Sequence, residues 1–181
     1  MRFASAISTE PGTEDAVAGA VGQVRDALAE ERADVVFLFC TPSHRAGLRH
    51  AKRFLREALG APPLAGCTGG GVLADGREAE ESPALSLLAG ALGGARVRVH
   101  HLVQEEIEGL GDAAAWHRRL GVVPDARPSF VVLPDPFTVD VDALLAELDA
   151  AYPGAPKVGG MASGGRAPGG HSLLAGDEIH E

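Results

Sequence analysis

The sequence predicts an α/β fold in which internally duplicated strand-helix-strand-hairpin units form mixed sheets flanked by helices. Two continuous apolar runs, at 35–40 and 130–133, are typical of strands buried on both faces. A stretch of helical periodicity follows each run. A proline and, three residues later, a glycine then recur in both copies, and Gly66 and Gly159 lie 93 residues apart (159 minus 66). The repeated order predicts a pseudo-symmetric fold.

Each element follows from a local pattern of apolar spacing, helix caps and turn dipeptides. The helix after the first apolar run carries Leu48, Ala51, Leu55 and Leu59 at helical spacing, and Gly60 stops it. In chain order, the patterns predict a strand at 3–9, a helix that Thr13 caps, a strand at 35–40, the helix ending at Gly60, a strand at 63–66, a hairpin at 72–80 that turns at Asp75-Gly76, strands at 84–92 and 96–101, a helix at 112–120, a strand at 130–133, a helix from Asp140 and a strand at 157–159.

The duplication sets the expected domain organisation. We expect one domain over residues 1–181 that holds pseudo-repeats at 35–103 and 129–181. The first copy follows its hairpin with an apolar strand at 84–92. The second copy stops at its hairpin, so it is one or two strands short, and a sheet built on the same plan exposes an edge. The expectation is therefore a fragment of a longer protein, or a homodimer formed through that edge.

Composition and charge argue against several classes of partner. The net charge of −9 disfavours a phosphate backbone, so no nucleic-acid partner is expected. The longest apolar run is too short to span a bilayer, and the N-terminus lacks the pattern of a signal peptide. The two cysteines do not make a disulfide framework, and reduced thiols are typical of a cytoplasmic protein. We therefore expect a cytoplasmic protein without a membrane partner.

A cluster of basic residues occupies the segment after the first apolar run. The spacing of these residues indicates a solvated helix face, and an anionic ligand bound at this face is the lesser alternative. The cluster consists of Arg45, Arg49, Lys52, Arg53 and Arg56.

Glycine-rich turns follow the second strand of each copy and form the candidate binding site. Backbone amides can converge on a ligand where such a turn ends a strand. The first turn lacks the Gly-Lys-Ser/Thr of a P-loop, and it leads into a strand where a dinucleotide-binding turn would lead into a helix. The alternative is that the glycines only allow tight turns. The predicted ligand-binding residues are Cys67, Thr68, Gly69, Gly70, Asp135, Gly160, Met161 and Ser163.

Cys67 and Asp135 each allow two interpretations. A thiol held among backbone amides can act as a nucleophile, whereas most buried cysteines are inert small hydrophobes. No local histidine motif supplies a base for Cys67, so no catalytic residue is assigned. Asp135 follows a buried strand between two prolines, where it would bind a ligand amine or form a turn. The histidines lack metal-ligand spacing, so neither a metal nor another cofactor is expected.

Several strings together resemble the FIST N-terminal domain, over nearly the whole chain. The most specific is PLAGCTGGGVLADGREAEESPALSLLAGAL at 63–92, with the family's Gly-Cys-Ser/Thr turn, glycine-rich hairpin, acidic stretch and apolar strand. Residues 7–11, 130–165 and 176–180 match its other recurrent pieces. The resemblance implies a sensory domain of signal transduction that binds small ligands such as amino acids. It also implies a FIST C-terminal domain or a signalling module as partner, and this chain stops inside the last hairpin of the N-terminal domain.

Three functions are compatible with these patterns. The first, which the resemblance favours, is a sensory domain without enzyme activity that binds an amino acid or a related metabolite. The second is a transferase or hydrolase that uses Cys67, and rapid alkylation of this thiol near neutral pH would favour it. The third is a protein-interaction module that docks through an open sheet edge, and size measurement across concentration would reveal it.

Overall fold

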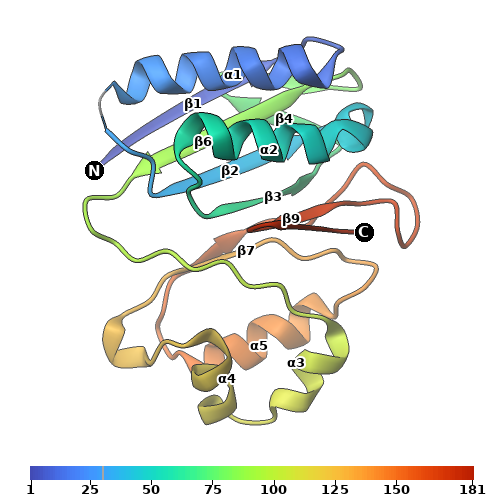
Figure 1. The fold of residues 1–181 in the computed structure, drawn as a ribbon. Coiled ribbons are helices and arrows are strands. Elements are labelled where there is room, and N and C mark those ends of the chain that lie inside the picture. The colour runs from blue at the N-terminus through green and yellow to red at the C-terminus, as the bar shows by residue number, and fades with distance from the viewer. Residues whose placement is uncertain (30) are drawn as a thin grey trace. The chain divides into compact units, whose positions relative to one another are not determined.

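The computed structural model describes residues 1–29 and 31–181 and divides them into two compact units. Unit 1 comprises residues 1–99 together with 163–181, and unit 2 comprises residues 100–162. Each unit combines strands with helices (Figure 1), so the predicted α/β class is confirmed. A single domain with two pseudo-repeats stays a prediction.

Unit 1 is built on a six-stranded mixed sheet with the strand order β1-β6-β2-β3-β9-β10. β2 and β3 run parallel, and the other neighbouring pairs are antiparallel. The parallel pair lies in the middle of the sheet, where a continuous apolar run such as that of β2 is expected. The strands are Arg2–Ser8 (β1), Val35–Cys40 (β2), Leu64–Thr68 (β3), Leu85–Ala91 (β6), Leu173–Ala175 (β9) and Glu178–His180 (β10).

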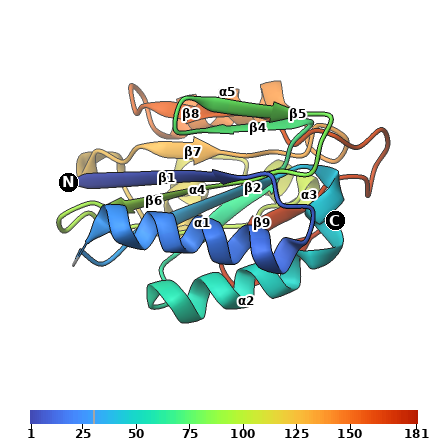
Figure 2. The ribbon, with the colours of Figure 1, turned by 90° about the horizontal axis from the view of Figure 1, so that it is seen from above.

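Two helices, α1 (Thr13–Leu28) and α2 (Leu48–Leu59), cover one face of this sheet (Figures 1 and 2). A short 3-10 helix, η1 (Pro42–Gly47), leads from β2 into α2. The helices pack apolar stripes against the sheet, in a core made mostly of Ala, Val and Leu. At the end of α2, Gly60 has a φ of +76°, the left-handed conformation that terminates a helix, as predicted.

A hairpin covers part of the opposite face of the sheet (Figure 2). Its strands are Gly71–Ala74 (β4) and Arg77–Glu80 (β5), and the turn residues Asp75 and Gly76 have φ angles of +52° and +69°. Two successive positive φ angles are typical of a type I′ turn, so the predicted hairpin is confirmed. Its apolar side chains form a small second core with Ile7 of β1.

Three local predictions are wrong. The strand at 130–133, expected to be buried on both faces, leaves Val131 51% exposed, because the helices of its unit cover only one of its faces. Residues 96–101, expected as a strand, form an irregular segment, because β6 already has β1 and β2 as neighbours and offers no edge to a hairpin partner. Thr13 does not cap α1, since Gly12 occupies the cap position and Thr13 begins the helix. The Thr13 hydroxyl lies 3.0 Å from Nδ1 of His44 instead, and Gly47 leaves the space in which the threonine side chain sits.

Unit 2 joins a two-stranded parallel sheet, β7 (Phe130–Val132) and β8 (Lys157–Gly159), to three helices. The helices lie together on one side of β7 (Figure 1), and the core of the unit encloses Trp116 and Tyr152. The helices after Asp112 and Asp140 begin as predicted, because each carboxylate accepts a hydrogen bond from the amide three residues on. The helices are α3 (Gln104–Leu110), α4 (Ala113–Leu120) and α5 (Val141–Ala151), with a 3-10 turn, η2, at Pro124–Ala126.

The two predicted copies share their order of elements and several backbone contacts. In each, a strand, a helix, a parallel strand and a hairpin follow one another. A Cβ added to Gly66 would lie 1.8 Å from the carbonyl oxygen of Leu38, and one added to Gly159 would lie 1.9 Å from that of Val132. Three hydrogen bonds from a backbone N–H to a carbonyl also have a match in the second predicted copy. Val36 to Pro63 matches Phe130 to Pro156; Gly69 to Cys40 matches Ala162 to Pro134; His44 to Thr41 matches Thr138 to Asp135.

The hairpins of the two copies are used differently. β4–β5 forms a separate two-stranded sheet, whereas β9 pairs with β3 and extends the six-stranded sheet. The matched contacts support a duplication, and the unlike hairpins depart from a common plan. The duplication therefore stays a prediction.

Candidate functional site

The glycine turn of the first predicted copy, residues 68–71, lies where the parallel strands β2 and β3 both end. Ligands of open α/β sheets bind beyond this edge. Three successive amides of the turn are not open to a ligand, because each donates a hydrogen bond to another part of unit 1. The bonds run from Thr68 to the carbonyl of Ser172 (3.0 Å), from Gly69 to the carbonyl of Cys40 (2.9 Å) and from Gly70 to Oγ of Ser163 (3.0 Å).

Ser163, predicted in the second glycine loop, contacts the first glycine turn directly. Its hydroxyl accepts from the Gly70 amide, and its own amide donates to the carbonyl of Thr68 (3.0 Å). A Cβ added to the exposed Gly70 would have no neighbour closer than 3.9 Å, whereas at Gly69 it would lie 2.8 Å from the carbonyl oxygen of Gly71. A ligand can therefore approach the turn from its open side, at Gly70.

Arg45, Ser172 and Glu181 complete this edge of unit 1. Ser172 is fully buried, and its amide donates to the hydroxyl oxygen of Thr68 (3.1 Å). Nε of Arg45 donates to Oγ of Ser172 (2.9 Å), and Nη2 of Arg45 lies 3.2 Å from Oε2 of Glu181. The sequence pattern placed Arg45 on a solvated helix face, and no pattern marked Ser172. The available signal was the position of Arg45, a few residues beyond the end of a buried strand.

Cys67 lies in β3 just before the turn, and its surroundings disfavour the thiolate. Burial raises the pKa of the Cys67 thiol to about 11. Burial, with a smaller contribution from the nearby Cys67, raises the pKa of Cys40 to about 12. Both cysteines are free and buried. Because the thiolate is the nucleophile, a thiol that stays protonated near neutral pH is poorly suited to covalent chemistry.

Asp135 forms a turn beyond β7 in unit 2. It is buried, and its Oδ1 accepts a hydrogen bond from the amide of Phe137 (2.9 Å). Its carbonyl accepts from the amides of Thr138 (3.1 Å) and Val139 (3.2 Å). The matching residue of the first copy, Thr41, is also buried, and its hydroxyl accepts from the backbone just before β6 (2.9 Å). The turn-forming interpretation of Asp135 thus has direct geometric support.

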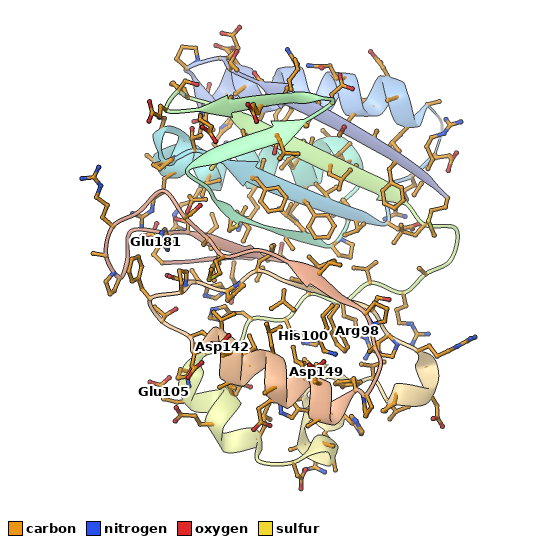
Figure 3. All side chains as sticks on the ribbon, turned by 180° about the vertical axis from the view of Figure 1, so that it is seen from behind. Arg98, His100, Glu105, Asp142, Asp149 and Glu181 are labelled. Atoms are coloured by element: carbon orange, nitrogen blue, oxygen red, sulfur yellow. The ribbon has the colours of Figure 1, made fainter. Side chains whose placement is uncertain are left out.

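Gly160 and Met161 line an apolar hollow of about 200 Å³ in unit 2. β7, β8 and α5 contribute valine and leucine side chains to its walls. Lys157 is the charged residue of the lining, and its ammonium is paired with Oδ1 of Asp149 (2.7 Å), which Figure 3 labels on α5. A hollow of this size and character suits a small apolar group, such as the side chain of an aliphatic amino acid.

A larger hollow, of about 580 Å³, lies between the C-terminal ends of α1 and α2 in unit 1. It is at the opposite end of β2 and β3 from the glycine turn, and no sequence pattern predicted it. Arg25, Asp26, Glu31 and Arg32 give its walls charges of both signs, so the hollow favours neither an anionic nor a cationic ligand.

The predicted site residues divide between the two units. In unit 1, the glycine turn and Ser163 form one hydrogen-bonded group. In unit 2, Gly160 and Met161 share a hollow, and Asp135 forms a turn. That all of them face one ligand stays a prediction. Unit 1 holds Cys67, Thr68, Gly69, Gly70 and Ser163, and unit 2 holds Asp135, Gly160 and Met161.

A metal centre and a membrane-spanning helix are both absent from the part of the chain that the structure describes. No three His, Cys, Asp or Glu side chains gather there as metal ligands would. None of its helices combines the length and the apolar character needed to cross a bilayer.

Comparison with known proteins gives one family and several relatives. The profile of the FIST N domain matches residues 34–181. An uncharacterized protein of Mycobacterium bovis is 27% identical over 180 residues, which cover 99% of this chain and 45% of the relative. An uncharacterized protein of Mycobacterium tuberculosis strain H37Rv is 27% identical over 169 residues, which cover 93% of this chain and 43% of the relative. The chain thus spans about half the length of these relatives. No solved structure gives a significant match.

Proposed function

The chain belongs to the FIST N domain family, a family of sensory domains, and on this premise we propose that it is the ligand-binding part of a signal-transduction protein. The observation that carries the proposal is the family match over residues 34–181. The ligand is a small molecule, an amino acid or a related metabolite, and it binds beyond the ends of β2 and β3.

The geometry of unit 1 supports this location. The glycine turn is braced by its own hydrogen bonds, so it offers a fixed surface at the exposed Gly70. A guanidinium from Arg45 and the hydroxyl of Ser172 stand at the same edge and supply hydrogen-bond donors for polar ligand groups. A small number of fixed polar groups that orient the ligand is one feature of small-molecule sites.

The relatives' additional length supports a second partner. This chain covers 45% and 43% of the two relatives, so the proposed whole protein includes further sequence such as a FIST C-terminal domain or a signalling module. In this proposal the chain detects the ligand, and the additional part passes on the signal.

The enzyme alternative gains no support at Cys67. Its pKa, raised to about 11 by burial, keeps the thiol protonated near neutral pH. We therefore propose binding without catalysis.

A thermal-shift screen tests the binding function. The chain is heated with each of the common amino acids and with a set of related metabolites. A ligand present at 100 times its Kd stabilises the folded state by about 2.7 kcal/mol, which raises the Tm of a chain of this size by roughly 5–10 °C. If no compound shifts the Tm at millimolar concentration, small-molecule sensing by this chain alone is wrong.

Two glycine variants then locate the site. Gly70→Val places a side chain on the open side of the turn, so we expect loss of the ligand-induced shift with little change in the Tm of the free protein. Gly69→Val is the matched control, since its Cβ would lie 2.8 Å from a backbone carbonyl and should lower the Tm itself. A full ligand response in Gly70→Val would place the ligand elsewhere.

One observation favours the interaction-module alternative. β10 lies at an edge of the six-stranded sheet, where its backbone groups are available to another strand. Its length of three residues limits such pairing. Sedimentation velocity across a hundredfold range of concentration tests this function: association would support it, and a constant monomer mass would leave docking to a different protein as its only form.

A further inference from the structure

The side-chain carboxylate of Glu181 contacts two hydrogen-bond donors in unit 1, near the ends of β2 and β3 where we propose that the ligand binds. Its Oε2 lies 3.2 Å from Nη2 of Arg45, and its Oε1 accepts a hydrogen bond of 3.4 Å from Oγ of Ser172. Each carboxylate oxygen therefore meets its own donor. Figure 3 labels Glu181 where the chain leaves the β9–β10 hairpin. Paired donors at fixed spacing are the arrangement that recognises a carboxylate.

The donors are held in place by the fold rather than by Glu181. Ser172 is 0% exposed, its amide donates to the Thr68 hydroxyl (3.1 Å), and its carbonyl accepts from the Thr68 amide (3.0 Å). The Ser172 hydroxyl accepts from Nε of Arg45 (2.9 Å), so it orients the guanidinium while its own proton points to the carboxylate. Since Thr68 belongs to the glycine turn, the two donors adjoin the proposed binding edge.

The carboxylate itself is held less firmly than its donors. The side chain of Glu181 is 59% exposed, and that of Arg45 is 27% exposed. The ion pair between Arg56 of α2 and Asp177, in the turn between β9 and β10, is closer at 2.8 Å, and no hydrogen bond among the described residues joins that arginine to a buried hydroxyl. An exposed carboxylate on two fixed donors can be displaced by another carboxylate.

We propose that Arg45 and Ser172 form the recognition site for a ligand carboxylate, and that Glu181 is the internal group which this ligand displaces. The inference rests on the proposed function for its biological role, and it narrows the ligand to small carboxylates, such as an amino acid with its α-carboxylate. The tethered Glu181 competes with the ligand at a high effective concentration, so it sets the threshold at which the site fills.

Acetate is the probe that tests the site without knowledge of the natural ligand. The Nε–Hε resonance of Arg45 is followed by NMR in ¹⁵N-arginine-labelled protein during an acetate titration. In Glu181→Gln, which removes the competing charge, we expect acetate to shift this resonance with an apparent Kd at least tenfold lower than in the wild type. Chloride at matched ionic strength controls for screening.

Asp177→Asn is the matched control, because it also releases an arginine from a carboxylate on the same hairpin. We expect acetate to leave the Arg56 resonance of this variant nearly unmoved. Equal acetate affinities at Arg45 in Glu181→Gln and at Arg56 in Asp177→Asn would overturn the proposal, since any released guanidinium would then suffice. Absence of acetate binding to Glu181→Gln would overturn it as well.

Two variants separate the donors from simple charge. In the Glu181→Gln background, Arg45→Lys keeps the positive charge but loses the planar guanidinium that bonds both Ser172 and the carboxylate, and Ser172→Ala removes the second donor. We expect each variant to bind acetate at least fivefold more weakly. The titrations are measured by the chemical shifts of the backbone amides in the glycine turn. An unchanged acetate affinity in Arg45→Lys would contradict recognition by the planar guanidinium. A failed metabolite screen alongside acetate binding here would reject the sensory role and leave the carboxylate site standing.

Discussion

The two strand-helix-strand segments that the sequence predicts to be copies differ most in what surrounds their parallel strands. β2 and β3 lie in the middle of a six-stranded sheet, whereas β7 and β8 form a sheet of two. Leu38 of β2 is accordingly buried, while Val131 and Val158 are 51% and 65% exposed. The same backbone contacts thus recur in a central position and in an exposed one. A shared local geometry therefore does not fix how strongly the stability of each segment depends on it.

The largest effect is expected from closing the space at the first matched glycine. In Gly66→Ala, the added Cβ would lie 1.8 Å from the carbonyl oxygen of Leu38, so the centre of the sheet must move apart. We expect a loss of at least about 3 kcal/mol in the free energy of unfolding, at the upper end of overpacking costs. Urea unfolding measures it, and a wild-type midpoint would contradict the close approach.

The matched substitution, Gly159→Ala, sharpens the comparison. Its Cβ would lie 1.9 Å from the carbonyl oxygen of Val132, and a φ of +153° disfavours any side chain. Because β7 and β8 are joined to no larger sheet, we expect faster amide exchange in residues 100–162 and unchanged exchange in the β2–β6 region. Equal loss of protection in both units would break the comparison.

Thr41, the counterpart of Asp135, gives the next largest effect. Its hydroxyl accepts from the Ala84 amide (2.9 Å) in a fully buried place. Thr41→Val leaves this amide without its partner, so we expect a loss of about 2 kcal/mol in the free energy of unfolding. Thr41→Ser keeps the hydroxyl and serves as control in the same thermal measurement. A serine variant as unstable as the valine variant would point to packing and away from the hydrogen bond.

His44 gives unit 1 a pH dependence at a position where the second copy has Thr138. Burial lowers the pKa of His44, and Nε2 meets no hydrogen-bond partner among the described residues. The unfolded state therefore binds the proton more readily than the folded state. The contribution of neutral His44 to the free energy of unfolding is fully present above about pH 6.5, and it is lost as the pH falls toward the lowered pKa. The slope for one proton is at most about 1.4 kcal/mol per pH unit.

Urea unfolding between pH 7.5 and 5 tests this dependence. In His44→Gln, which cannot titrate, we expect a flatter profile than in the wild type. His50→Gln, at a partly exposed histidine of α2, is the matched control, and a profile flattened equally in both variants would count against a particular role of His44. Parallel profiles for the wild type and His44→Gln would assign the dependence to other groups.

Cys67, whose predicted counterpart is Gly160, is the position where we expect the least chemical reactivity. With a pKa of about 11, about one thiol in 3,000 is ionised at pH 7.5. We expect iodoacetamide to alkylate the folded protein at least a hundredfold more slowly than the urea-unfolded protein. Mass spectrometry of the Cys67 peptide measures the rate. Rapid alkylation of the folded chain would reopen the enzyme alternative.

Local sequence signals predicted most helices, strands and turns, but they did not predict the long-range contacts between them. The apolar run of β2 and the dipeptide Asp75-Gly76 each carry their structure within a few residues. Thr13 was misread because its hydroxyl turns to His44, a residue far along the chain. The pairing of β9 with β3 has no local signature either, since three residues with apolar side chains fit many edges.

The candidate site shows the same limit. The repeated pattern predicts the glycine turn and Ser163 as ligand-binding residues, and a hydrogen bond joins Gly70 to Ser163. That they bind a ligand stays a prediction. The bond between Arg45 and Ser172 joins residues 127 positions apart, so neither residue alone indicates it. A basic residue near the end of a buried strand was a usable hint, but the periodicity of its helix favoured solvent exposure.

The return of the chain to unit 1 after residue 162 has a consequence for biosynthesis. β3 is complete at Thr68, but its neighbour β9 begins at Leu173, 105 residues later (173 minus 68). At a ribosomal rate of roughly 5–20 residues per second, β9 is synthesised about 5–20 s after β3. Unit 2 is translated during that interval. During this interval one side of β3 lacks its partner strand and can pair with strands of neighbouring nascent chains. We therefore expect misassembly of this protein to be most frequent on crowded polysomes.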